Sequence, residues 1–301
     1  LTKLNCVLVA VPRTRKSFFS GERSGSPDEA PLLSITRVTG SPTYTLSRSR
    51  CARTSATFSS GSLSSTLISA LILNDKGLER ALACRVQHVS MSVSVSDSHS
   101  RKNARKPAAE ALNSMVELIK NAKREGLEVR AGLQSAFGCV YEGAISQKDV
   151  LDAVEKMMSA DVNEINLADS TGMANPQSIR SLVNEVSRRF PEARISLHLH
   201  DTRGLGLANM FSGYEAGVRI FDVCAGGLGG CPFIKGAAGN VPTEDAVHMF
   251  ESMGIGTGVD LKGLISAVDF LESTLERSLP GRMKRVLSSQ QICNSRSNSL
   301  Q

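Results

Sequence analysis

Apolar residues along positions 67–277 follow two alternating periods. Short runs that are apolar throughout, or at every second position, predict strands, whereas apolar positions three and four apart predict helices. Strands are expected at residues 67–73, 88–96, 127–133, 164–168, 195–200 and 218–223. Helices are expected at residues 77–82, 106–124, 146–160, 176–189, 205–216 and from 240 or 243 to 253, with a last helix at 261–277.

This order of alternating strands and helices predicts an α/β fold with a parallel sheet covered by helices. The candidates are a doubly wound sheet and a closed barrel. Polar residues follow three strand ends, at Asp169, at His198 and His200, and at Cys231, and a barrel gathers such residues at one face. No GxGxxG follows a strand and no GxxxxGK[ST] occurs, so the dinucleotide-binding alternative lacks its phosphate loop. We therefore expect a TIM (β/α)8-type barrel.

The barrel is expected to be incomplete, because six βα units are recognisable and residues 1–66 do not resemble the two missing ones. Residues 1–66 are rich in Ser and Arg, and their short apolar runs are broken by Pro and Gly. Three interpretations are equally open: a transit peptide, a disordered leader, and, since the chain begins with Leu1, a fragment or a wrongly assigned start of the reading frame. The predicted domains are this leader, a barrel at residues 67–287 and a flexible tail at residues 288–301.

The positive charge belongs to the leader. Residues 1–66 hold nine of the 35 Lys and Arg and three of the 29 Asp and Glu, which leaves 26 of each for residues 67–301. The net charge of +6 therefore gives no argument for nucleic-acid binding by the barrel. No run of about 18 apolar residues predicts a transmembrane helix, and the seven cysteines form no CxxC pair, which favours a reduced intracellular protein. We expect neither a nucleic-acid nor a membrane partner.

The His198-Leu199-His200 tripeptide lies at the end of a predicted strand. Alternation along a strand places both imidazoles on one face, where they are candidate metal ligands; two partly exposed polar residues are the alternative. Asp201 has the opposite phase, so it is expected to cap a helix or give hydrogen-bond support. The amide oxygen of Asn240 beside two imidazoles suits Mg²⁺ or Mn²⁺ better than tetrahedral zinc. Asp169 begins a turn, and for it catalysis and a turn role are both open.

A glycine-rich loop lies between residues 226 and 239, where six of fourteen residues are glycine. Such a backbone can approach a ligand closely, and long loops in compact domains are often functional. Cys231 lies in the middle of it, where a thiol would be accessible and could be activated by a nearby metal or imidazole. Cys224 and Cys139 are expected to be packed in the core.

Several motifs together resemble the 3-hydroxy-3-methylglutaryl-CoA lyase family of TIM-barrel metallolyases. The resemblance extends over about residues 67–287 and rests on residues 94–103 (SVSDSHSRKN), 137–143 (FGCVYEG), 168–172 (ADSTG), 198–204 (HLHDTRG), 227–232 (GLGGCP) and 239–245 (GNVPTED). The HxHDxxG motif marks the superfamily, which includes isopropylmalate and homocitrate synthases. The GGCP loop and the TED sequence after Asn240 favour the lyase.

The resemblance implies site residues and a reaction. His198, His200 and Asn240 would coordinate a divalent cation, Mg²⁺ or Mn²⁺, and Cys231 would be the catalytic thiol. His198 and Asp169 would also be catalytic, and Glu244 would support the metal loop. The implied reaction is retro-Claisen cleavage of 3-hydroxy-3-methylglutaryl-CoA to acetyl-CoA and acetoacetate.

The sequence departs from the family in one respect. The family's first strand carries an Arg-Asp-Gly-x-Gln segment whose Asp is a metal ligand, and its second strand supplies a Glu; this sequence contains no such segment. We therefore expect a weak or inactive enzyme. Two alternatives are a lyase or synthase on a related acyl-CoA, such as a citramalyl type, and a non-catalytic truncated barrel. The sequence does not decide between the cytoplasm and the mitochondrial matrix as the compartment. A homodimer is possible as the oligomeric state.

Overall fold

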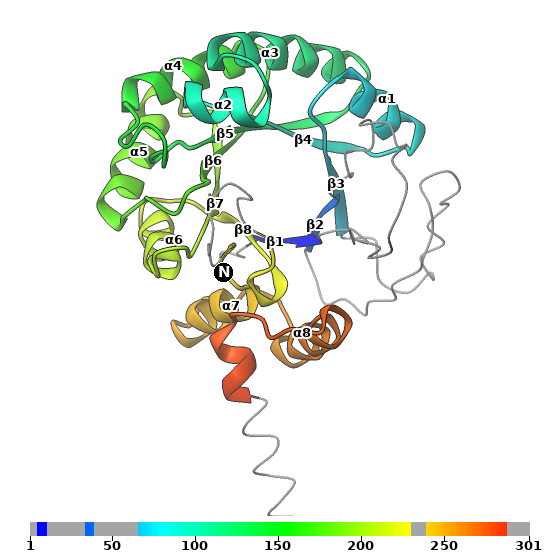
Figure 1. The fold of residues 1–301 in the computed structure, drawn as a ribbon, viewed down its shortest axis with the longest axis vertical. Coiled ribbons are helices and arrows are strands. Elements are labelled where there is room, and N and C mark those ends of the chain that lie inside the picture. The colour runs from blue at the N-terminus through cyan, green and yellow to red at the C-terminus, as the bar shows by residue number, and fades with distance from the viewer. Residues whose placement is uncertain (1–4, 11–33, 39–65, 230–238, 288–301) are drawn as a thin grey trace, which may run out of the picture.

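Eight strands form a closed ring in the computed structural model, which describes residues 5–10, 34–38, 66–229 and 239–287. Six consecutive strands of the ring are parallel: β3 (Thr66–Leu71), β4 (His88–Ser94), β5 (Glu128–Gln134), β6 (Glu164–Asp169), β7 (Arg194–Leu199) and β8 (Ile220–Val223). They match the six predicted strands and curl into the wall of an α/β barrel (Figure 1). The predicted incomplete TIM-type barrel is thereby confirmed.

Two further strands close the ring, and the sequence analysis anticipated neither. β1 (Asn5–Ala10) pairs parallel with β8 and antiparallel with β2 (Ser34–Val38), and β2 is also antiparallel to β3. These two strands are therefore not the missing βα units of a complete (β/α)8 barrel. Their apolar runs are short and separated by residues rich in Pro, Gly and Ser, which hides them from a reading by periodicity. The predicted tail, residues 288–301, lies outside the described residues.

The helices lie on the outside of the parallel strands (Figure 1). Helices α1 to α6 follow β3 to β7 around the wall, α7 and α8 come after β8, and a further helical stretch at residues 282–287 ends the described chain. They are α1 (Asp75–Ala83), α2 (Asp97–Asn103), α3 (Ala108–Arg124), α4 (Gln147–Met158), α5 (Pro176–Arg189), α6 (Gly206–Glu215), α7 (Thr243–Ser252) and α8 (Leu261–Leu275). No helix in the described ranges is long and apolar enough to cross a membrane.

Among the labelled α-helices, α2 is the one that the hydrophobic pattern missed. Its sequence is polar, so no apolar period reveals it. The Ser96 hydroxyl caps it by accepting from the backbone N–H of His99 at 3.1 Å, and Asp97 lies in its first turn, where a negative charge complements the helix dipole. The helix forms because local capping replaces the missing apolar face.

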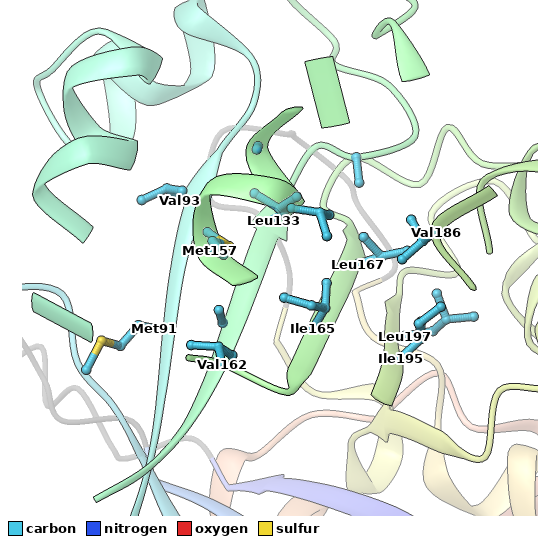
Figure 2. Packing of buried hydrophobic residues seen from close by; sticks show 14 of the residues in the cluster. Met91, Val93, Leu133, Met157, Val162, Ile165, Leu167, Val186, Ile195 and Leu197 are labelled. Carbon is cyan, nitrogen blue, oxygen red and sulfur yellow. The ribbon is translucent and has the colours of Figure 1, made fainter. Parts of the chain in front are cut away.

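The two faces of the parallel strands carry different residue types. Leu197 and Leu199 of β7 are fully buried, and Figure 2 shows Leu197 among the core side chains that β4 to β7 share with the surrounding helices. Ser196 and His198 occupy the alternate positions of the same strand, as the two-residue period requires. The outer face therefore supplies the apolar core, whereas the inner face is free to carry polar groups.

We expect Leu197→Ala to lower the free energy of unfolding by about 2–5 kcal/mol, because it leaves a cavity in this core. The matched control is Leu73→Ala, since the Leu73 side chain is 58% exposed and should cost less than about 0.5 kcal/mol. Urea denaturation monitored by circular dichroism measures both. Equal costs for the two variants would contradict the assignment of Leu197 to the core.

Candidate functional site

The two histidines of the HxH motif face each other at the carboxyl end of β7. Their Nε2 atoms are 3.2 Å apart and their ring centroids 5.2 Å apart. His200 is buried, and burial, followed by the nearby His198 imidazole, lowers the pKa of His200 to about 3. His200 is therefore neutral at physiological pH, and neutral imidazole is the form that binds a metal ion. Two ring nitrogens at this separation can share one cation.

Asn240 lies directly beside His200. The two residues form an antiparallel bridge, in which Asp201 donates its N–H to the Gly239 carbonyl at 2.9 Å. The Asn240 Nδ2 atom donates to the Leu228 carbonyl at 2.7 Å, whereas its buried Oδ1 atom has no hydrogen-bond partner among the residues that the structure describes. A buried acceptor without a partner is costly unless something else satisfies it. The structure thus brings the three predicted ligands together, and two imidazole nitrogens with one amide oxygen are donors that a divalent cation can accept.

A carboxylate ligand is absent from this set. No group of three or more His, Cys, Asp or Glu residues that could hold a metal ion occurs in the part of the chain that the structure describes. The donors there are two imidazole nitrogens and one amide oxygen, and none of them is an anionic oxygen. Such a set binds a hard divalent cation more weakly than one that includes an anionic oxygen.

A buried ion pair lies behind His198, and the sequence analysis missed it. Asp222 of β8 accepts from Arg130 of β5 through both carboxylate oxygens, at 2.7 and 3.1 Å, and both side chains are less than 5% exposed. The Asp222 Oδ2 atom is also 3.2 Å from Nδ1 of His198. Desolvation raises the pKa of Asp222, but Arg130 and His198 outweigh it and bring that pKa down to about 2. Asp222 is therefore a carboxylate that can only accept, so Nδ1 of His198 is the donor.

This pair could have been suspected from two charged residues inside strands that are otherwise apolar. Arg130 interrupts the run Val129, Ala131 and Leu133, and Asp222 stands between Phe221 and Val223. A single charge in a buried strand is rarely tolerated without a partner. What the sequence does not contain is which two strands the partners come from.

Asp169 is fully buried at the end of β6, and both of its oxygens are used by the turn that follows. Oδ1 accepts from the N–H of Met173 at 2.8 Å and Oδ2 from that of Ala174 at 3.0 Å. Burial raises its pKa, although these two hydrogen bonds and the charges of Arg203 and His198 act in the opposite direction. The geometry supports the turn role; a catalytic role for Asp169 stays a prediction.

Asp201 supports the backbone, as its phase on the strand predicted. Its Oδ1 atom accepts from the N–H of Gly206, the first residue of α6, at 2.8 Å. Its Oδ2 atom is 3.4 Å from Nη1 of Arg282. The prediction of a capping or hydrogen-bonding role for Asp201 is confirmed.

Glu244 is buried at the start of α7, beneath the glycine-rich loop. Its Oε2 atom accepts from the N–H of Gly226 at 3.0 Å, whereas Oε1 finds no hydrogen-bond partner in the described part of the chain and lies against Gly281. Burial raises the pKa of Glu244 to about 7. The Cys224 thiol is buried too, and its burial, followed by the nearby Glu244 charge, raises its pKa to about 12. Cys224 is therefore a packed thiol, as predicted. Glu244 is thus placed against the backbone that leads into the loop, where a supporting role was predicted.

The remaining predicted cysteines differ in what the structure says of them. Cys139 is fully buried and its Sγ atom accepts from the Ser96 hydroxyl at 3.0 Å, so the predicted packing role is confirmed. Cys231 lies outside the described residues, and its role as the catalytic thiol stays a prediction. The loop is described up to Gly229 and again from Gly239, and those two glycines are in contact. A Cβ atom at Gly239 would be 1.8 Å from the Gly229 carbonyl oxygen.

Comparison with known proteins places these features in one family. The profile of the HMGL-like family matches residues 51–271. The (R)-citramalyl-CoA lyase of Chloroflexus aurantiacus is 40% identical over 211 residues, which is 70% of this chain and 67% of that protein. The crystal structure of the Bacillus subtilis HMG-CoA lyase superimposes with a TM-score of 0.70 at 38% identity and covers 73% of this chain and 74% of its own.

A third relative was solved with ligands. The structure of an HMG-CoA lyase from Acinetobacter baumannii in complex with coenzyme A and 3-methylmalate gives a TM-score of 0.68 at 38% identity, covering 71% of this chain and 70% of that one. Two further relatives differ in compartment. The cytoplasmic 3-hydroxy-3-methylglutaryl-CoA lyase of the rat is 35% identical over 67% of this chain and 59% of that protein. The mitochondrial hydroxymethylglutaryl-CoA lyase of the mouse is 36% identical over 70% of this chain and 65% of that protein. Both compartments considered for this chain therefore occur among its relatives.

We expect Gly239→Ala to lower the free energy of unfolding, because it disturbs the backbone that leads into Asn240. Gly239 has a φ of +88°, and an added Cβ would meet the Gly229 carbonyl. The matched control is Gly204→Ala, because Gly204 has a similar φ of +73° but no atom within 4 Å of an added Cβ. Left-handed backbone alone costs about 1–2 kcal/mol, so Gly204→Ala should lose about that much and Gly239→Ala clearly more. Equal losses in urea denaturation would show that the contact is easily relieved.

We expect the buried Glu244 carboxyl to make the protein less stable as the pH rises from about 4.5 to about 7. Its folded pKa of about 7 lies above its ordinary value of 4.5, so in this window the folded state holds a proton that the unfolded state has lost. Stability therefore falls across the window and is level above it. Subtracting the stability curve of Glu244→Gln from that of the wild type, with urea denaturation at each pH, isolates this contribution. A flat difference curve between pH 4.5 and 7 would contradict it.

Proposed function

This chain belongs to the HMGL-like family and is a carbon–carbon lyase that acts on an acyl-CoA, and we propose that its substrate is 3-hydroxy-3-methylglutaryl-CoA. The reaction would be a divalent-metal-dependent retro-Claisen cleavage to acetyl-CoA and acetoacetate, which is a step in leucine degradation and ketone body formation. The observation that carries the metal dependence is the pair of Nε2 atoms 3.2 Å apart, next to the unpartnered amide oxygen of Asn240.

His198, His200 and Asn240 would hold the cation, Mg²⁺ or Mn²⁺. When bound, such an ion lowers the pKa of a coordinated hydroxyl and stabilises the negative charge that develops in the reaction. A base takes the proton of the tertiary hydroxyl. The hydroxyl oxygen becomes the ketone oxygen of acetoacetate, and the electron pair of the broken carbon–carbon bond goes to the α-carbon of acetyl-CoA. We assign the proton that this carbon then needs to the Cys231 thiol. Asp169 and Glu244 would hold the surrounding backbone.

The rate of this chain is expected to be low. The sequence has no Arg-Asp-Gly-x-Gln segment, so neither the carboxylate ligand nor the Arg that the family uses to neutralise the enolate can be identified. The loss of one such electrostatic group costs about 10²–10³ in rate. An assay beside the Bacillus subtilis relative, at equal protein and Mn²⁺ concentration, measures this difference.

We expect Cys231→Ala to abolish the remaining cleavage, with a fall of at least about 10² relative to the unmodified chain. The matched control is Cys84→Ala, since Cys84 is exposed and follows α1 before β4, at the opposite end of the strands from the site. It should retain full activity. Acetyl-CoA release in the presence of Mn²⁺ is measured for both variants. Undiminished activity in Cys231→Ala would remove the thiol from the mechanism.

A second candidate substrate is favoured by the 40% identity to the (R)-citramalyl-CoA lyase. Citramalyl-CoA would be cleaved by the same bond-breaking step, with pyruvate rather than acetoacetate as the second product. The two are distinguished by offering both acyl-CoA esters to the same preparation and analysing the keto acid. Pyruvate as the preferred product would overturn the proposed substrate but leave the lyase chemistry intact. Cleavage of neither ester, by a folded protein saturated with Mn²⁺, would support a non-catalytic barrel.

A further inference from the structure

Arg130 and Asp222 lie in the barrel interior, below the histidine pair. Arg130 belongs to β5 and Asp222 to β8, with β6 and β7 between them in the ring, so their ion pair crosses the interior instead of linking neighbouring strands. Asn166 of β6 adds a contact, since its Nδ2 atom is 3.4 Å from Asp222 Oδ2 and 3.0 Å from the hydroxyl of Ser196. Side chains from β5 and β6 therefore hold the Asp222 carboxylate of β8 in one place.

The fixed carboxylate reaches one ring atom of His198. His198 and Asp222 are register partners in the ladder between β7 and β8, and Asp222 Oδ2 lies 3.2 Å from Nδ1 of His198. A carboxylate has no proton to donate, so Nδ1 carries the hydrogen and Nε2 carries the lone pair. That Nε2 atom is the one that faces His200.

We propose that the Arg130–Asp222 pair is a positioning unit, which holds His198 in the Nδ1–H tautomer so that its Nε2 lone pair is directed at the cation. Carboxylates that bind the second nitrogen of a metal-bound histidine fix both its tautomer and its ring orientation, and their loss typically costs about 10–100-fold in metal affinity. The proposal rests on the metal dependence in the proposed function, although its first consequence, the tautomer, concerns the protein before any metal binds.

The test must separate positioning from stability, because removing one member of a buried ion pair leaves the other charge without a partner. The double variant Arg130→Met/Asp222→Leu removes both charges and the acceptor while preserving approximate volume. The double variant Arg130→Met/Asp222→Asn removes the same charges but keeps an oxygen that can accept from Nδ1. The control Arg180→Met alters an ion pair on the helices outside the barrel, since Arg180 of α5 binds Glu215 of α6 at 3.2 Å, away from Arg130, Asp222 and His198.

Two measurements are made on each protein. Nitrogen-15 NMR of the histidine rings, with His198→Ala to assign the signals, reports the tautomer in the metal-free protein. Titration with Mn²⁺, followed by the electron paramagnetic resonance of the free ion, gives the dissociation constant. The wild type and Arg180→Met should show the Nδ1–H tautomer and equal Mn²⁺ affinity. The Leu variant should lose that tautomer and bind Mn²⁺ about 10–100-fold more weakly, and the Asn variant should recover most of both.

Distinct results overturn each idea. A wild-type His198 with its hydrogen on Nε2 overturns the positioning role whether or not the variants fold. Equal Mn²⁺ affinity in the Leu variant and the wild type, or equal loss in the Leu and Asn variants, also overturns it. A wild type that has the Nδ1–H tautomer but binds no Mn²⁺ removes the metal dependence from the proposed function, while the assignment of the tautomer to Asp222 stands.

Discussion

The bidentate ion pair between Arg130 and Asp222 is the interaction on which the centre of this barrel depends. Both side chains are almost completely buried, and a buried charge is tolerated only when a partner and hydrogen bonds compensate its desolvation. Asp222 meets that requirement with Arg130, Asn166 and His198 together. Because the three partners come from β5, β6 and β7, the Asp222 carboxylate is satisfied only when the barrel wall is curled as observed. Removal of one member of the pair would leave the other charge buried without a partner and lower the free energy of unfolding by about 3–5 kcal/mol.

This interior polar layer is possible because the strands have an apolar outer face. Leu197, Leu199 and their neighbours pack against the helices and supply the hydrophobic stabilisation, so the inner positions of the same strands are not needed for the main core. A two-residue period then fixes which positions those are: Ser196 and His198 on β7, and Asp222 on β8, point inward. The same alternation that builds the fold thus delivers the histidines to the site.

The segment from β8 to α7 completes the site by close contacts of the backbone. Gly226 and Gly227 have positive φ, Gly239 touches Gly229 without space for a side chain, and the buried Glu244 carboxyl accepts from the N–H of Gly226. These contacts bring Asn240 into a bridge with His200, forty residues earlier in the chain. The glycines therefore act through geometry, since they allow the amide ligand to approach the imidazoles.

The sequence by itself determined the six strand–helix units, the strand that carries His198 and His200, the family and the candidate ligands. Local rules suffice for these, because periodicity, capping and short motifs are properties of neighbouring residues. Only the tertiary structure decided that Asp222 supports His198, and that both carboxylate oxygens of Asp169 accept hydrogen bonds from the turn that follows it. It also revealed that β1 and β2 close the ring, with β2 antiparallel to both β1 and β3. The physical reason is that each of these facts depends on a partner distant in sequence, such as Arg130 for Asp222, and no local pattern encodes which distant partner a buried polar group will meet.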